Sequence, residues 1–294
     1  MLNSGAASST ALTAAAARAA HRLVDAEPLI FDDPLAHTLL GDRADGLLEF
    51  HRAHGNHPIL ACARTLVTTR SRFTESRLAA AVGRGTRQYV ILGAGLDSFA
   101  YRADPSAAPT LAIFEVDHPD TQAWKLRRLD DASIPAPGTL SFVGVDFEQD
   151  VLADHLAAAG FDATVPAYVS WLGVSMYLTE DAIRETLAVV ATFAPGTELV
   201  LDHMLPPDLC DEAGRMYAEA VGANSADQGE PWLSVLSPAE VARMCEQSGL
   251  VAVEQVSTRD SVDPALWERT DALAPIRLSA LTRAVVPAIP GQFG

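Results

Sequence analysis

A turn with two glycines, directly after a short apolar run, constrains the fold of this chain most strongly. Residues 89–92 read Tyr-Val-Ile-Leu and lead into Gly93 and Gly95. Such a run suits a strand buried on both faces, and glycine lets the backbone turn tightly and approach a ligand without a Cβ in the way. The next apolar run ends at Asp117, where the acid of a nucleotide-binding βαβ unit accepts hydrogen bonds from ribose hydroxyls. The sequence therefore predicts an α/β fold with a nucleoside site at these three residues.

The glycine turn leaves the nucleotide itself open. A nicotinamide fingerprint has a third glycine or an alanine three residues after the second glycine, and Ser98 holds that place here. Asp97, on the same turn, would repel a phosphate but tolerate a cation. A ligand with a cationic sulfonium is therefore favoured, and a nicotinamide-dependent oxidoreductase stays as the weaker alternative.

Four sequence blocks in a fixed order carry a resemblance to a known family. They are LGAGLDSFAYR at 92–102, FEVDHP at 114–119, VDF at 145–147 and SMYLTED at 175–181. With this order and spacing the chain resembles the leucine carboxyl methyltransferase family, class I O-methyltransferases that use S-adenosylmethionine and include many actinobacterial small-molecule enzymes. The resemblance spans nearly the whole chain and implies S-adenosylmethionine as the cofactor.

The resemblance also implies roles for residues outside the glycine turn. Asp146 would take the adenine amino group, the backbone of Phe147 would read the ring, and His118 would lie near the ribose or adenine. By the family's register Arg70 would bind the cofactor carboxylate, since a planar guanidinium grips a carboxylate bidentately; Arg72 is the runner-up. For Asp146 the alternative is a capping role at the helix expected to start near residue 149.

One position departs from the family pattern. Many members place a glutamate ahead of the end of the fourth strand to hold the cofactor ammonium, and this chain has Leu172 there. The ammonium would then lie against backbone carbonyls near Leu172 and Gly93. This departure motivates a second hypothesis, a protein that keeps the fold and the cofactor pocket but acts as a cyclase or a binding module.

The residues that could act on the acceptor are less distinct. A carboxylate acceptor is ionised at pH 7 and needs only positioning, whereas a phenol or alcohol benefits from a general base. His203 and Tyr177 are the candidates for a catalytic role, and the alternative for His203 is a hydrogen-bonded histidine at a strand end. Tyr177, Tyr217, Trp232 and Phe31 would border the pocket and suit a flat or lipophilic acceptor. The predicted substrate is a small molecule, for example a polyketide-type carboxylic acid or phenol of secondary metabolism.

The pattern of breakers predicts a helical cap at 1–85 and a Rossmann-like domain at 86–294, with a lid insertion at about 206–236. Apolar runs and helical patterns alternate after residue 88, which is typical of a mostly parallel sheet with helices on both faces. We expect Ser8, Ser9 or Thr10 to cap the first helix and Glu115 to pair with Arg102. The expected strands lie at 89–92, 111–116, 140–145, 167–174, 197–201 and 250–256, and 276–286 is an amphipathic or strand-like stretch.

The composition of the chain argues against several kinds of binding partner. The net charge of −17 argues against nucleic acid, because proteins that bind phosphates cluster Lys and Arg. No apolar run reaches the length of a membrane span. The three cysteines lack metal-ligand spacing, so we expect no metal site and a reducing cytoplasm. The oligomeric state stays open.

Overall fold

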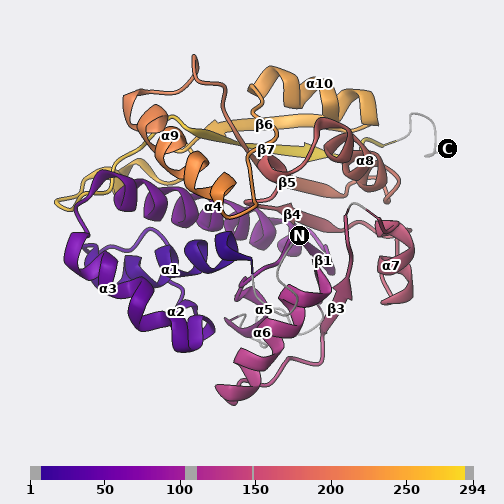
Figure 1. Cartoon of the computed structure of the whole chain (residues 1–294). Coiled ribbons are helices and arrows are strands. Elements are labelled where there is room, and N and C mark those ends of the chain that lie inside the picture. The colour runs from indigo at the N-terminus through magenta and orange to yellow at the C-terminus, as the bar shows by residue number, and fades with distance from the viewer. Residues whose placement is uncertain (1–7, 103–110, 148, 289–294) are drawn as a thin grey trace.

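A sheet of seven strands forms the centre of the protein in a computed structural model that describes residues 8–102, 111–147 and 149–288 (Figure 1). Its strand order is β3-β2-β1-β4-β5-β7-β6. The first five strands pair in parallel, and β7 runs antiparallel to both of its neighbours. The strands are β1 (Gln88–Leu92), β2 (Ala112–Asp117), β3 (Leu140–Gly144), β4 (Tyr168–Trp171), β5 (Glu198–Met204), β6 (Val251–Ser257) and β7 (Ser279–Val285).

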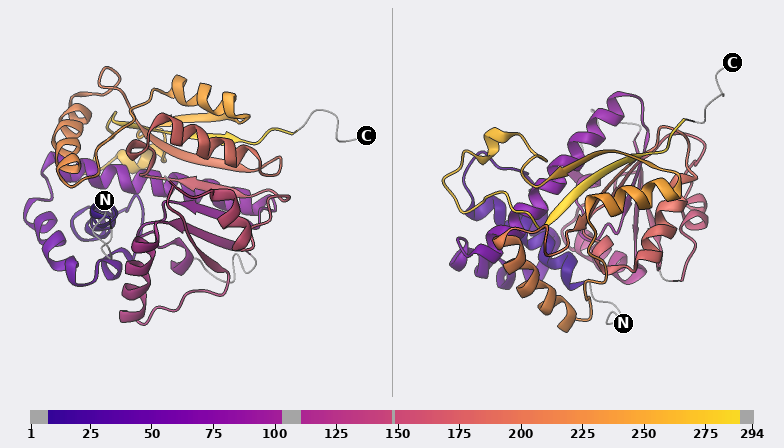
Figure 2. Two further views of the ribbon diagram at one scale, coloured as in Figure 1. Left: turned by 45° about the vertical axis from the view of Figure 1, so that its right-hand side comes forward. Right: turned by 90° about the horizontal axis from the view of Figure 1, so that it is seen from above.

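Helices cover both faces of the sheet (Figure 2), as the alternation in the sequence predicted. Successive side chains of a strand point to opposite faces, so Val90 and Leu92 pack into one core and Tyr89 and Ile91 into another. The first core is closed by α7 (Leu152–Ala158), α8 (Glu180–Ala191) and α10 (Pro238–Ser248), and the second by α4 (Pro58–Gly83) and α5 (Phe99–Arg102). Burial on both faces is what makes β1 uniformly apolar.

The N-terminal part is helical, and its first helix is capped where the sequence predicted. The Ser8 side chain accepts a hydrogen bond from the Ala11 backbone N–H. The elements are α1 (Ser9–Val24), α2 (Ala36–Leu40), the 3₁₀ helix η1 (Gly41–Arg43) and α3 (Ala44–His54), followed by α4. Helix α4 also packs on the sheet through Phe73 and Leu78. The helical part therefore shares its longest helix with the sheet.

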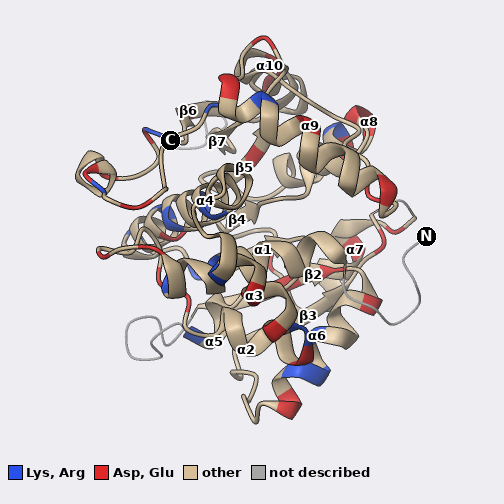
Figure 3. Cartoon of the chain, turned by 60° about the vertical axis from the view of Figure 1, so that its left-hand side comes forward, with Lys and Arg blue, Asp and Glu red and all other residues tan. Residues whose placement is uncertain are grey.

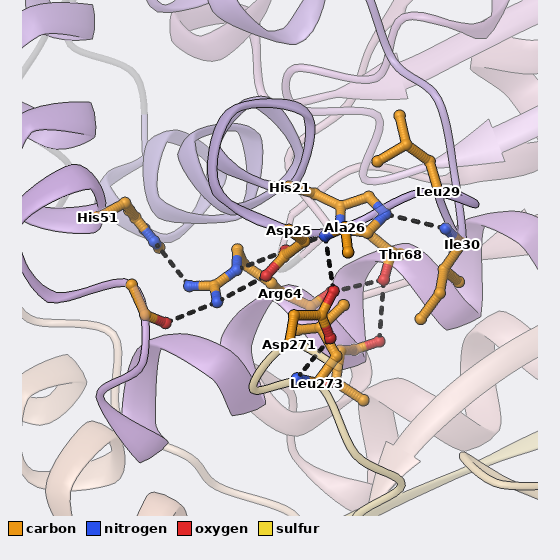
Figure 4. Close-up of polar contacts among 12 residues, drawn as sticks. His21, Asp25, Ala26, Leu29, Ile30, His51, Arg64, Thr68, Asp271 and Leu273 are labelled. Atoms are coloured by element: carbon orange, nitrogen blue, oxygen red, sulfur yellow. Dashed lines mark hydrogen bonds and ion pairs between the residues drawn. The ribbon is translucent and has the colours of Figure 1, made fainter. Parts of the chain in front are cut away.

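A buried charged network fastens the N-terminal helices to one another (Figure 4). Arg64 on α4 donates to both carboxylate oxygens of Asp25, over 2.7 and 2.9 Å, and to the Gly55 carbonyl over 2.7 Å. Nδ1 of His21 lies 2.8 Å from the same carboxylate, and the Ile30 N–H donates to its Nε2. Since Nε2 accepts, Nδ1 carries the proton and donates to Asp25. The network holds the end of α1 against α4.

The predicted pair of Glu115 and Arg102 is wrong. Glu115 instead binds Lys125 of α6 (Pro119–Asp131), with 2.6 Å between Oε2 and Nζ, and both side chains are buried. Arg102 reaches Glu75 of α4 and Asp33 of the helical part. The strand pattern placed Glu115 inside the sheet but did not show which element covers it, and α6 folds back along β2 and brings Lys125 to Glu115. Burial raises the pKa of Glu115 to about 7.

Several element boundaries differ from the prediction. The fourth strand ends at Trp171 because Gly173 takes a left-handed backbone with φ +71° before the 3₁₀ helix η2 (Ser175–Tyr177). The stretch predicted as an insertion at about 206–236 contains α9 (Glu212–Asp227), and the stretch at 276–286 contains β7. Short helix η3 (Pro264–Trp267) completes the described elements. No helix in the described ranges is both long and apolar enough to cross a membrane.

Candidate functional site

A cavity of about 910 Å³ opens at the carboxyl ends of the central strands. It lies where the strand order reverses between β1 and β4, which is the place where open α/β sheets bind ligands. The first helices and α9 gather at this end of the sheet in both Figures 1 and 2. Nine of the ten residues predicted for the site line this one cavity, namely Arg70, Gly93, Gly95, Asp117, His118, Asp146, Phe147, Leu172 and Tyr177.

The glycine turn and Asp117 form one hydrogen-bonded unit. Gly93 has a φ of +66°, and a Cβ there would lie 2.2 Å from Val174 Cγ2, so only glycine fits. The Gly95 N–H donates to Oδ2 of Asp117 over 2.5 Å, and the His118 N–H donates to Oδ1 over 2.7 Å. Burial raises the pKa of Asp117, and these two N–H donors oppose that shift. The carboxylate is thereby fixed at the cavity wall.

The N-terminal helices support the same turn. Arg18 of α1 donates to the Leu96 carbonyl over 2.6 Å and to the Asp33 carboxylate over 2.9 Å. The Coulombic attraction of Arg18 and Arg102 lowers the pKa of Asp33 against its burial. The glycine turn therefore depends on contacts from the helical part as well as on its own strand.

Asp146 and Phe147 follow β3 at the far end of the cavity. The Gln149 side chain donates to Asp146 Oδ2 over 2.8 Å, and the Asp146 N–H donates to Asp150 over 2.9 Å. Val151, not Asp146, holds the N-cap position of α7, so the alternative capping role is not supported. Phe147 packs partly against the sheet core below.

Arg70 is fixed from the side away from the cavity. Its Nη1 donates to Asp202 Oδ2 over 2.8 Å, and Asp202 Oδ1 accepts from the Gly173 N–H over 2.6 Å. The guanidinium crosses Gly173 so closely that a Cβ there would lie 2.6 Å from Nη2. Arg72, the runner-up, is exposed, does not line the cavity and donates to the Ile30 carbonyl.

Sequence reasoning missed Asp202 and Gly173. Both stand at strand ends, and Asp202 directly precedes His203 at the end of the apolar run 199–201, so a search for acids at the ends of strands could have found it. Leu172, beside Gly173, also lines the cavity and brings no charge to it.

The cavity continues into an apolar chamber between α1, α4 and α9. Trp232 Nε1 is buried there near the Tyr177 hydroxyl, and no described residue gives it a hydrogen bond of normal geometry. Burial raises the pKa of both Tyr177 and Tyr217, so both phenols are protonated at neutral pH. The residues that form this apolar chamber are Ala14, Ala17, Ala63, Leu66, Val67, Met176, Tyr177, Met204, Tyr217, Val221 and Trp232.

Glu230 also lines the cavity and binds the start of α1. Its carboxylate accepts hydrogen bonds from the Ser8 hydroxyl over 2.7 Å, the Ser9 hydroxyl over 2.9 Å and the Thr10 N–H over 3.2 Å. A carboxylate at a helix N-terminus is favourable because the free N–H groups there carry partial positive charge. The loop after α9 is thus tied to the start of α1.

His203 lies outside the cavity, in contrast to its predicted role as a base. Its side chain is buried, with Nδ1 2.8 Å from the Leu236 carbonyl and Nε2 3.3 Å from the Thr282 hydroxyl. Burial lowers its pKa. Side chains alternate in direction along a strand, so the His203 side chain points toward the segment before α10 and not into the cavity. The geometry therefore favours the alternative, a structural histidine.

Comparison with known proteins agrees with this geometry. The chain is 32% identical over 286 residues to the Bacillus subtilis (strain 168) protein named "Putative S-adenosyl-L-methionine-dependent methyltransferase YktD", covering 90% of this chain and 93% of that protein. A Mycolicibacterium vanbaalenii protein of the same descriptive name is 34% identical over 215 residues, or 68% of each chain. A crystallised DUF574 family protein from Streptomyces avermitilis shares the fold, with a TM-score of 0.60, 17% identity and coverage of 92% and 97% of the two chains.

The sheet order and helix placement are those of the class I S-adenosylmethionine-dependent methyltransferases. The sequence profile described as leucine carboxyl methyltransferase matches residues 11–191, which include the glycine turn, Asp117, Asp146 and Tyr177. The chain therefore belongs to the leucine carboxyl methyltransferase family of S-adenosylmethionine-dependent methyltransferases.

Proposed function

We propose that this protein binds S-adenosylmethionine and transfers its methyl group to an already ionised oxygen, a carboxylate or an acidic hydroxyl, of a small apolar molecule. The observation that carries the proposal is the continuity of one cavity. The turn with Asp117 forms one end of it, Arg70 lines its middle, and the apolar chamber forms the other end.

The residues present fit this cofactor. Asp117 would accept from the ribose hydroxyls, Asp146 and Phe147 would bind the adenine beside His118, and Arg70 would hold the carboxylate. Gly93 leaves space at the turn that a Cβ would fill. Among the described residues that line the cavity, carboxylates outnumber guanidiniums, which suits a ligand with a cationic sulfonium: Asp97, Asp117, Asp146 and Glu230 against Arg18 and Arg70.

The apolar chamber favours an acceptor that needs no general base. Among the described residues that line the cavity there is no Lys, the only His is His118 beside Asp117, and the Glu230 carboxylate is bound by Ser8, Ser9 and Thr10. Burial raises the pKa values of Tyr177 and Tyr217. These phenols and the Trp232 N–H, which lies near the Tyr177 hydroxyl, therefore offer hydrogen-bond donors and do not remove a proton. An oxygen that is anionic at pH 7 matches such donors, whereas an aliphatic alcohol would need deprotonation.

The proposed reaction needs no proton transfer. The cofactor, when bound, supplies a methyl group on a positively charged sulfur. As the oxygen–carbon bond forms, the carbon–sulfur bond breaks, the sulfonium becomes a neutral thioether and the acceptor anion becomes a neutral ester or ether. The chain's own residues would align the acceptor and exclude water. Glu230, bound to Ser8 and Ser9, joins the loop after α9 to the start of α1 beside the cavity, which favours a small acceptor over a protein tail.

The first test is calorimetric titration with S-adenosylmethionine and S-adenosylhomocysteine, comparing wild type with Asp117→Ala and Arg70→Ala. We expect wild type to bind and each variant to lose about 10- to 100-fold in affinity, because each loses hydrogen bonds in which one partner is charged. Transfer of radioactive methyl to a panel of aromatic carboxylic acids, acidic phenols and polyketide-type acids, with the matching alcohols as controls, then tests the acceptor class. Absence of binding to either nucleoside ligand refutes the proposal.

Leu172 favours a second candidate function. Because no carboxylate stands at this position to hold the cofactor ammonium, the protein could retain the cofactor pocket and serve as a cyclase or a binding module. Binding of S-adenosylhomocysteine together with no methyl transfer to any acceptor in the panel would support this candidate. A Leu172→Glu variant that tightens S-adenosylmethionine binding would show that the ammonium is weakly held in wild type.

A further inference from the structure

We propose that Asp202 is a positioning residue that sets the orientation of Arg70 toward the amino-acid end of the cofactor; this inference rests on the proposed function. Asp202 stands on β5, 132 positions after Arg70, and does not line the cavity itself. It would act through the guanidinium and not by touching the ligand.

The contacts of Asp202 fix three parts of the site at once. Oδ2 accepts from Arg70 over 2.8 Å, Oδ1 accepts from the Gly173 N–H over 2.6 Å, and its backbone carbonyl accepts from the Ser175 hydroxyl over 2.7 Å. Asp202 is 2% exposed, so these bonds replace nearly all of its contact with water. A buried carboxylate with both oxygens bound has little freedom to move, and neither has the guanidinium it holds.

The position of Arg70 explains why such an anchor matters. An arginine side chain has many rotamers, and ordering a side chain of this kind on binding lowers affinity. The Arg70 side chain is 17% exposed and crosses Gly173, where the missing Cβ leaves it room. Asp202 is the only described residue that accepts a hydrogen bond from the Arg70 side chain, so the remaining donors of the planar group can meet a carboxylate that approaches from the cavity.

Charge balance supports the same role. Arg70 and Asp202 together are neutral, and the amino-acid end of the cofactor, with one carboxylate and one ammonium, is also neutral. An unpaired Arg70 would attract the carboxylate but repel the ammonium, and Leu172 supplies no negative charge nearby. Asp202 supplies the compensating charge from behind the guanidinium.

The affinities for two ligands distinguish a positioning role of Asp202 from a general structural role. S-Adenosylhomocysteine carries the amino-acid group, whereas methylthioadenosine has the same adenosine and thioether sulfur without it. We expect Asp202→Asn to lower the affinity for S-adenosylhomocysteine about tenfold, because an unanchored Arg70 must then be ordered when the ligand binds, and to leave methylthioadenosine affinity within about twofold. Asparagine can still accept from Gly173, so the variant removes mainly the bond to Arg70.

Arg70→Met and the double variant complete the test, measured by titration calorimetry. Because Asp202 acts through Arg70, the double variant should bind S-adenosylhomocysteine no more weakly than Arg70→Met alone. Glu198→Gln, on the same strand but paired with Arg84 and Arg283 away from the cavity, is the matched control and should change neither affinity.

Three results would overturn the inference: an equal loss of both ligands in Asp202→Asn, unchanged binding of S-adenosylhomocysteine, or additive losses in the double variant. If wild type binds neither ligand, the proposed function itself fails. That outcome is distinct, because it does not depend on any variant.

Discussion

Replacing Arg64 with methionine should destabilise the protein strongly, because it leaves the Asp25 carboxylate buried without its main partner. Both side chains of this pair are at most 1% exposed. Removal of one partner from a buried ion pair typically costs about 3–5 kcal/mol. Methionine retains much of the apolar stem, so most of the loss comes from the charge and from the unbound Gly55 carbonyl.

Urea unfolding followed by circular dichroism measures this loss, and calorimetry gives the shift in Tm. At about 2 °C per kcal/mol for a chain of this size, Tm should fall by about 6–10 °C. Arg22→Met is the matched control on α1. Arg22 pairs with Asp32, but these side chains are 41% and 60% exposed, so its loss should stay below about 1 kcal/mol.

The double variant Asp25→Asn with Arg64→Met tests the cause. Removing the buried charge as well should recover part of the stability, so the double variant should be less destabilised than the sum of the two single variants by at least about 1 kcal/mol. Equal effects of Arg64→Met and Arg22→Met, or simple additivity in the double variant, would refute the reasoning.

Three further predictions concern the site and its surroundings. Gly173→Ala places a Cβ against the Arg70 guanidinium and should weaken S-adenosylhomocysteine binding at least about tenfold. The control is Gly160→Ala, because Gly160 also has a positive φ, +92°, but a Cβ there would meet no atom within 4 Å. This control should lose only about 1–2 kcal/mol of stability and leave binding unchanged. Burial raises the pKa of Glu115 from 4.5 to about 7, so folding takes up a proton at pH values between these two. The unfolding free energy of wild type relative to Glu115→Gln should therefore fall as the pH rises through this range and then level off. A difference in urea unfolding that does not change with pH would contradict this prediction. Glu230→Gln should raise amide hydrogen exchange about tenfold at the start of α1 and at 228–233, because the hydrogen bonds of the charged Glu230 side chain to Ser8 and Thr10 are worth about 1–2 kcal/mol. Unchanged exchange would refute this role of Glu230.

The distribution of charged residues is relevant to the kind of molecule that this protein binds. Figure 3 shows Lys and Arg of the described residues spread over several elements, with Asp and Glu between them. The arginines of the core and the site are paired inward, as Arg64 is with Asp25 and Arg70 with Asp202. A small-molecule acceptor stays our proposal for the partner, and the binding assays above are its test.

Local sequence determined the parts of this protein that depend on neighbouring residues. The apolar run 89–92, the two glycines and Asp117 lie within one βα unit, and their backbone requirements follow from residue type alone. The same holds for the Ser8 cap, because a helix N-terminus is satisfied within three residues of its start. The alternation of apolar runs and helical patterns likewise predicted the sheet with helices on both faces.

Only the tertiary structure decided which charged and polar side chains meet. Glu230 and Ser8 are 222 positions apart, and Arg70 and Asp202 are 132 apart, so no local pattern could join them. The burial of His203 and the pairing of Glu115 with Lys125 likewise follow from how β5 and α6 pack. Periodicity gives the face on which a side chain lies, but its partner depends on the neighbouring element that covers that face. That is why the glycine turn with Asp117 could be predicted from the sequence, while the ion pair of Arg70 with Asp202 and the contact of Glu230 with the start of α1 could not.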